Sequence, residues 1–130
     1  MRTKISLLFS LLIPLILLSC EKIDIGESFV CKVGDKIRVT SNLSFSVISV
    51  YDWRCPIDLI CLSSGDVDIS LRFHDGLQRV DTVLCLLSNG RNPIEIGGYS
   101  FKLLEVEPPS ESDKTIPQDD FRIKMTVLND

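Results

Sequence analysis

Apolar and polar residues alternate along much of the chain after residue 30, which is the pattern of half-buried β-strands. The clearest run is 66–73, where apolar residues fall on one face and charged or polar residues on the other. Alternating runs predict further strands at 36–40, 43–51, 78–87, 99–106 and 121–128. No segment after residue 30 carries a sustained helical period.

Pairs of turn-forming residues separate these runs: Asp75-Gly76, Asn89-Gly90, Gly97-Gly98 and Pro108-Pro109. The run 43–51 changes phase at Ile48, which predicts a β-bulge or a strand buried on both sides. About seven short strands with regular turns predict an all-β fold, an antiparallel β-sandwich or a partly open barrel. We expect it to form a single domain over residues 31–130.

The start of the chain carries a different pattern, in which two basic residues precede an almost unbroken apolar run from Ile5 to Leu18. This run is shorter than the roughly 20 residues of a membrane-spanning helix and is typical of a secretory signal peptide. Leu17-Leu18-Ser19-Cys20 resembles a bacterial lipobox, which is cut before its cysteine. We expect a signal peptide at 1–19, lipid on Cys20 and a tether at 20–30. The alternative is an ordinary signal peptide with a chance cysteine.

This anchor predicts a lipoprotein of the cell envelope, in the outer membrane of a Gram-negative bacterium. The chain is acidic, with 14 basic against 18 acidic residues, so we expect membrane contact only through the lipid on Cys20. The same acidity argues against nucleic acid as a partner. Glu21 and Asp24 resemble a surface-export signal, or they belong to a solvated linker.

Four cysteines remain besides Cys20, and an even number in an exported domain predicts disulfides. Sequence alone does not choose among the three pairings. Proximity favours Cys55–Cys61, and Cys31 with Cys85 then forms a second bridge or stays as buried thiols. The spacing of these cysteines fits neither a thioredoxin-like redox motif nor a zinc site, so we expect no metal and no cofactor.

Side chains able to perform catalysis are present, but they form no recognisable constellation. The one histidine, His74, precedes a predicted turn, where exposed polar residues are expected. Asp66 and Asp68 lie on one face of a predicted strand. They form either a carboxylate pair for sugar or calcium chemistry or, far more commonly, a solvent-facing surface. We therefore expect no catalytic residues and no enzymatic activity.

The connection at 52–65 is unusually apolar and contains the sequence RCPIDLIC. One interpretation is that this loop plugs the open end of the core. The other is that Trp53, Arg54, Ile57 and Leu59 form an exposed binding patch, since Trp and Arg are enriched at binding hot spots.

DWRCPIDLICLSSGDVDISL, residues 52–71, resembles the D-S-R-C-P-x-x-x-x-C-x-W-A-G segment of a group of small bacterial lipoproteins and secreted β proteins. The polar loop and alternating strand within 97–128 are similar to the end of that group's chains. Trp53 stands where the group has Ser, and Leu62-Ser63-Ser64 replaces its Val-Trp-Ala. The group has no established activity, so the resemblance implies fold and location alone.

Together these features predict a lipid-anchored, non-enzymatic binding or accessory module with a protein or glycan ligand. One alternative is an inhibitor of exported proteases, because braced loops on small β-sandwiches suit insertion into a cleft. The other is a hydrolase that uses the carboxylates of Asp66 and Asp68.

Overall fold

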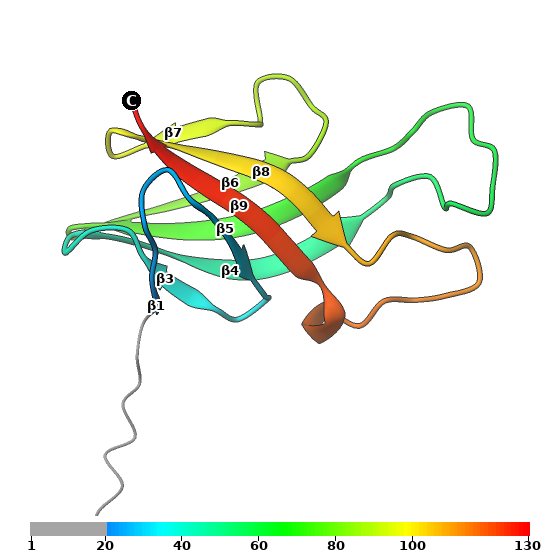
Figure 1. Ribbon diagram of the computed structural model, residues 1–130, viewed down its shortest axis with the longest axis horizontal. Helices are drawn as coiled ribbons and strands as arrows, with labels where there is room; N and C mark the ends of the chain where they lie inside the picture. Colours follow the sequence, from blue (N-terminus) through cyan, green and yellow to red (C-terminus); the bar gives the residue numbers. More distant parts are fainter. Residues whose placement is uncertain (1–20) are drawn as a thin grey trace, which may run out of the picture.

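The computed structural model describes residues 21–130, which form a sandwich of two β-sheets (Figure 1). One sheet has the order β1-β3-β4-β5-β6 and the other β2-β9-β8-β7. The strands are β1 (Glu21–Lys22), β2 (Ser28–Cys31), β3 (Lys36–Arg38), β4 (Leu43–Asp52), β5 (Val67–Asp75), β6 (Gln78–Cys85), β7 (Ile94–Ile96), β8 (Tyr99–Glu107) and β9 (Arg122–Asn129). All pairs are antiparallel except β1 with β3. The predicted β-sandwich is confirmed; it is not closed into a barrel.

Every run predicted to be a strand is one in the structure, with ends that differ by two residues at most. The phase change at Ile48 is a register shift between Val47 and Ser49 in the pairing of β4 with β5. This bulge turns Ile48 to solvent and returns Val50 to the core. The predicted hairpin turn is also present, with Asp75 opposite Gln78.

The segment predicted to be a tether differs from that expectation. β1 pairs with β3 and β2 pairs with β9, so residues 21–31 extend both sheets. Ile23, which follows β1 in the sequence, is buried in the core. β1 has only two residues, and in β2 the apolar residues Phe29, Val30 and Cys31 follow one another without alternation, so the sequence did not indicate either strand. The predicted signal peptide and the predicted lipidation site at Cys20 lie outside the described residues.

The core fills the space between the two inner faces. Three phenylalanines occupy its centre, with ring centroids 4.8–5.6 Å apart: Phe45, Phe73 and Phe101. Two of these three contacts are edge-to-face, an arrangement that adds to the gain from burial. Apart from the strands, the described chain has one short 3-10 turn, η1 (Gln118–Asp120). No helix between residues 21 and 130 is long and apolar enough to cross a membrane.

Candidate functional site

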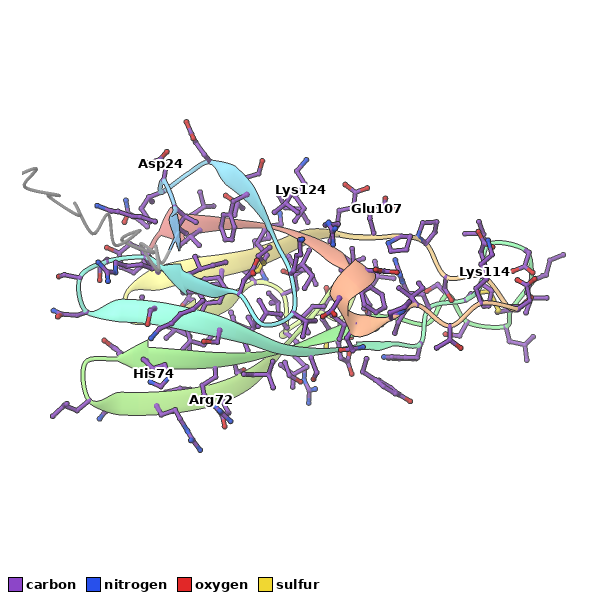
Figure 2. The ribbon with its side chains drawn as sticks, turned by 90° about the horizontal axis from the view of Figure 1, so that it is seen from below. Asp24, Arg72, His74, Glu107, Lys114 and Lys124 are labelled. Carbon is purple, nitrogen blue, oxygen red and sulfur yellow. A yellow bond between two sulfur atoms is a disulfide. The ribbon has the colours of Figure 1, made fainter. Side chains whose placement is uncertain are left out.

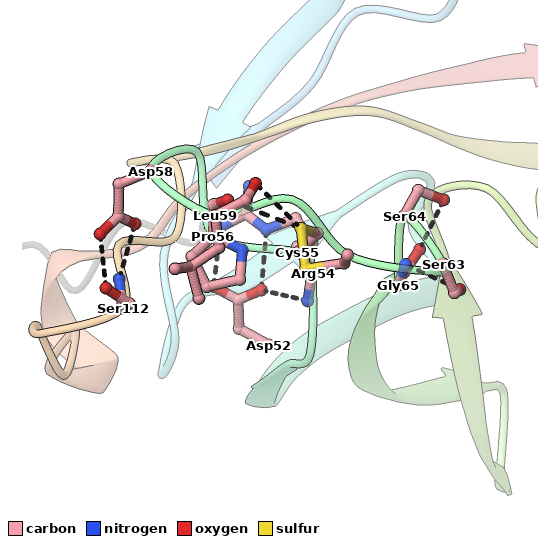
Figure 3. The surroundings of a disulfide bond; sticks show 11 residues. Asp52, Arg54, Cys55, Pro56, Asp58, Leu59, Ser63, Ser64, Gly65 and Ser112 are labelled. Carbon is pink, nitrogen blue, oxygen red and sulfur yellow. Dashed lines mark hydrogen bonds and ion pairs between the residues drawn. A yellow bond between two sulfur atoms is a disulfide. The ribbon is translucent and has the colours of Figure 1, made fainter.

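The connection between β4 and β5 forms a compact lobe, residues 53–65, at one end of the sandwich (Figure 1). A disulfide joins Cys55 to Cys61 across the lobe, which confirms this predicted bridge (Figure 3). The Trp53 N–H donates to the Asp66 carbonyl oxygen at 3.0 Å, and the Cys55 N–H donates to the Ser64 carbonyl oxygen at 2.8 Å. These bonds extend the β4–β5 pairing, so the lobe is built on the five-stranded sheet.

Gly65 allows the two arms of the lobe to come together. Its φ of 65° lies in the left-handed region, which glycine adopts without steric cost. A Cβ at this position would overlap the Trp53 carbonyl oxygen and lie 2.9 Å from Arg54 Cα. Any side chain here would therefore push the arms apart.

Arg54 ties the base of the lobe to the opposite sheet. Its Nε and Nη2 atoms donate to the two carboxylate oxygens of Asp52 at 2.7 and 2.8 Å. Its Nη1 and Nη2 atoms also donate to the carbonyl oxygens of Val106 and Pro108 at 2.7 and 2.8 Å. Since Val106 belongs to β8, the guanidinium joins the two sheets at this end. Charge-assisted bonds of this kind are strong, and the bidentate pair fixes geometry.

This arrangement corrects one prediction about the binding patch. The side chain of Arg54 is only 16% exposed, and that of its partner Asp52 is 11% exposed. The guanidinium is committed to one carboxylate and two carbonyl groups within the protein. Arg54 therefore supports the lobe and does not belong to an exposed patch.

The loop at 108–117 supports the lobe from the side. The Ile57 N–H donates to the Ser110 carbonyl oxygen at 2.9 Å. The Asp58 carboxylate accepts hydrogen bonds from both the hydroxyl and the backbone N–H of Ser112 (Figure 3). The bond from the Ser112 hydroxyl, helped by that from its N–H, lowers the pKa of Asp58. The lobe thus has covalent, ionic and polar supports.

The lobe holds its apolar side chains in solvent. We call four of them the crest: Ile57, Leu59, Ile60 and Leu62. Ile60 and Leu62 are fully exposed, and Ile57 and Leu59 are more than half exposed. Trp53, at the base of the lobe, is 49% exposed. The interpretation of the loop as a plug of the core is therefore wrong, because the apolar side chains that would fill the core are exposed.

A polar recess lies beside the base of the lobe. It measures about 260 Å³, and its lining includes Asp52, Ser110, Lys114 and Gln118. The Gln118 side chain is fixed in place by hydrogen bonds to the N–H and C=O of Val50, at 2.9 and 3.0 Å. An apolar crest beside a polar recess has the anatomy of a protein interface, in which an apolar centre is bordered by polar groups.

The carboxylates of Asp66 and Asp68 do not form a pair open to solvent. Asp66 is 2% exposed and accepts hydrogen bonds from the N–H groups of Val67 and Leu87 and from the Ser88 hydroxyl. Burial raises the pKa of Asp66, but these hydrogen bonds outweigh it and hold the pKa below its ordinary value. Asp66 therefore fixes the chain after β6 to the start of β5, which corrects the view that it faces solvent.

Cys85 and Asp68 complete this cluster. The Cys85 thiol donates to Asp68 Oδ1 at 3.0 Å, and one ligand atom from each of Asp66, Asp68 and Cys85 lies within 4.8 Å of the others. Burial, with the Asp68 carboxylate, raises the pKa of Cys85 to about 11. A thiol with this pKa is protonated at neutral pH and is a poor nucleophile, because the thiolate is the reactive form.

The suggested bridge between Cys31 and Cys85 is not formed, since Cys85 retains its thiol. Cys31 lies on β2 of the four-stranded sheet, and its sulfur is 3.6 Å from the Ile123 carbonyl oxygen. Cys85 ends β6 at the edge of the other sheet. Both are buried, which was the alternative open from the sequence.

In comparisons with known proteins, no family model, curated protein or solved structure matches this chain.

Proposed function

We propose that this protein is a lipid-anchored envelope lipoprotein that acts as a non-enzymatic binding module through its lobe. The observation that carries the proposal is the crest, four aliphatic side chains held in solvent on a rigid support. Leaving such side chains in water forgoes roughly 1.5–3 kcal/mol of burial free energy for each of them. A partner that covers the crest recovers part of this free energy.

A protein is the partner that this surface fits best. The crest is aliphatic, and the polar recess lies beside the base of the same lobe, where Ser110 lines the recess and its carbonyl oxygen accepts a hydrogen bond from the Ile57 N–H. An apolar centre with polar groups near it is typical of protein interfaces. Its support is already rigid, so little conformational entropy is lost when it is covered. The partner we propose is an exported protein with an apolar groove wide enough to receive Ile60 and Leu62.

The position of the lobe suits an anchored binding module. Glu21 lies in the same cross-strand row as Phe45, through the pairing of both with Ile37. The lobe begins after Asp52, seven residues further along β4, which corresponds to roughly 23 Å of strand. Figure 2 shows the same separation, with Asp24 toward one end of the molecule and Lys114 at the other. The proposed anchor next to Glu21 therefore leaves the lobe accessible.

The proposal is tested by comparing two surface variants of the full chain. Ile60→Ser with Leu62→Ser removes the outermost part of the crest, and Val30→Ser changes an exposed apolar residue on β2. Each protein is cross-linked in intact envelopes, and its bound proteins are quantified by mass spectrometry. We expect one exported protein to be lost with the crest variant and kept with Val30→Ser. Equal recovery from both variants would show that the crest is not the binding surface.

A second candidate function is inhibition of an exported protease. The observation that favours it is the shape of the lobe: a disulfide closes a seven-residue stretch, Cys55 to Cys61, that projects exposed side chains. Such a loop can enter a cleft while the bridge resists cleavage. The test is inhibition of a panel of exported proteases, in which Ile60→Asp should abolish inhibition. Uninhibited proteases throughout the panel would remove this candidate.

A further inference from the structure

The strand β6 leaves one edge of the five-stranded sheet open. Within residues 21–130 it is the last strand of the sheet and pairs only with β5. The Cys85 N–H points away from β5, because it donates to the Arg91 carbonyl oxygen at 3.0 Å. Backbone groups alternate in direction along a strand, so those of Arg79, Asp81 and Val83 also face the open edge. The edge therefore offers a short row of donors and acceptors.

We propose that two copies of this chain pair through β6 in an antiparallel ladder, with the twofold axis at Val80. Asp81 already pairs with Arg72 at 2.9 Å and with Arg79 at 3.7 Å within its own chain. In this register Arg79 of each copy also lies opposite Asp81 of the other, so each Asp81 gains a further opposite charge. Antiparallel strands place residues directly opposite one another, and opposite charges stabilise such pairs. The backbone groups of Arg79 and Asp81 both face the open edge, so these residues also exchange hydrogen bonds.

Charge selects this register over its neighbours. The backbone alternation allows only slips that keep the residues with outward-facing groups opposite each other. A slip in one direction places Asp81 opposite Asp81 of the second copy, and the other slip places Arg79 opposite Arg79. Both place like charges in contact, which destabilises pairing. The arrangement around Val80 is the one in which the charges are complementary.

The turn next to β6 adds an apolar contact to the same pairing. Leu77 is fully exposed at the tip of the hairpin. The register around Val80 brings Leu77 beside Val83 of the second copy. Val83 lines an outer groove of about 210 Å³ together with Ile48 and Ser70. The groove is next to Arg72, whose position near the open edge is visible in Figure 2. Leu77 can therefore cover apolar surface of the second copy.

The proposed dimer is compatible with two anchors in one membrane. Glu21 lies level with Val80, because both belong to the row that runs through Ile37, Phe45 and Phe73. The two Glu21 residues therefore lie at the outer edges of a joined sheet, level with the twofold axis. Nine strand spacings of about 4.8 Å place them roughly 43 Å apart. The two lobes point in opposite directions along the strands, so neither blocks the other.

The test uses the full chain in its own membranes, with a cysteine at the proposed axis. Val80 is partly exposed, and its replacement by cysteine is conservative. In this register the new thiol faces the same thiol of the second copy. Membranes are oxidised with copper phenanthroline and analysed on non-reducing gels. We expect a covalent dimer from Val80→Cys and none from the wild-type chain, which controls for the native cysteines. A dimer no more abundant than in the wild type overturns the proposal.

Two further variants test the register and the role of charge. Asp81→Cys should cross-link far less than Val80→Cys; the reverse result would overturn the register. In the Val80→Cys background, Arg79→Glu places like charges opposite each other and should reduce the dimer about tenfold. Lys102→Glu makes the same change of net charge on β8 and should leave the yield unchanged. Equal yields from these two charge variants would show that the contact is not the proposed ladder.

Discussion

The strand β5 and the lobe that precedes it contain similar apolar residues but hold them in opposite environments. The alternate apolar side chains of β5 are at most 1% exposed, whereas those of the crest are at least 52% exposed. β5 lies on a pleated sheet whose inner face is covered by a second sheet. The lobe lies beyond that cover and is held by a disulfide and by polar bonds. Apolar character therefore leads to burial only where the fold supplies a facing surface.

The largest expected effect is on the free energy of unfolding, and it distinguishes β5 from the crest. Phe73→Ala should lower the free energy of unfolding by about 3–5 kcal/mol, because it leaves a cavity at the centre of the core. Ile60→Ala in the crest should change it by less than about 0.5 kcal/mol. Urea unfolding of both variants measures the difference. Losses of similar size would mean that the crest is part of the stabilising core.

Loss of the Arg54 contacts should be the next largest effect. Arg54→Ala leaves Asp52 as a mostly buried carboxylate without its partner, and it frees the carbonyl groups of Val106 and Pro108. We expect a loss of about 3 kcal/mol in the free energy of unfolding. Lys102→Ala, at an exposed site on β8, is the matched control and should have little effect. A loss no greater than in this control would contradict the role assigned to Arg54.

The hydrogen bonds of Asp66 predict a dependence of stability on pH. Asp66→Asn should cost about 2 kcal/mol at neutral pH, because it weakens three hydrogen bonds, one buried and two partly buried. The pKa of Asp66 is lower in the folded than in the unfolded state. Its stabilisation is therefore complete above pH ~4 and is lost as pH falls below that value. The difference between wild type and variant should shrink over this range in acid unfolding curves; a constant difference would contradict the assignment.

Removal of the disulfide should affect the lobe more than it affects the β-sandwich. The double variant Cys55→Ser, Cys61→Ser should lose about 2 kcal/mol, since the bridge closes only a short stretch of chain. The local effect should exceed the global one, because the bridge braces the crest. Limited proteolysis should give new cuts between residues 57 and 62 while the rest of the domain stays intact. Unchanged resistance within the lobe would show that the polar bonds alone hold it.

The sequence was most informative where a regular pattern repeats. Alternation indicated β5 and β9 with small errors at their ends, and the short spacing of Cys55 and Cys61 indicated their bridge. β1, β2 and β7 were not indicated: β1 has two residues, β2 has consecutive apolar residues, and β7 is a single Ile-Glu-Ile alternation. Their existence depends on the strands beside which they lie, which is information that the sequence pattern of a short segment does not contain.

The roles of the polar residues could not be predicted for a similar reason. Arg54 bonds a carbonyl group 52 residues away, and Asp66 accepts bonds from groups 21 and 22 residues away. Backbone carbonyl and N–H groups occur at every position, so no sequence signal marks those that a side chain will contact. Exposure of the crest was one of two interpretations of an apolar loop, and only the geometry separates them.

The most direct test of the binding role uses a photo-reactive amino acid in place of Ile60 in living cells, with the same replacement of Val30 as control. Both positions are exposed and apolar, but only Ile60 lies on the lobe. Illumination should attach one exported protein to the chain at Ile60 and not at Val30, and the disulfide variant should reduce the yield. No attachment at Ile60, or the same products at both positions, would contradict the account of the lobe as a binding surface.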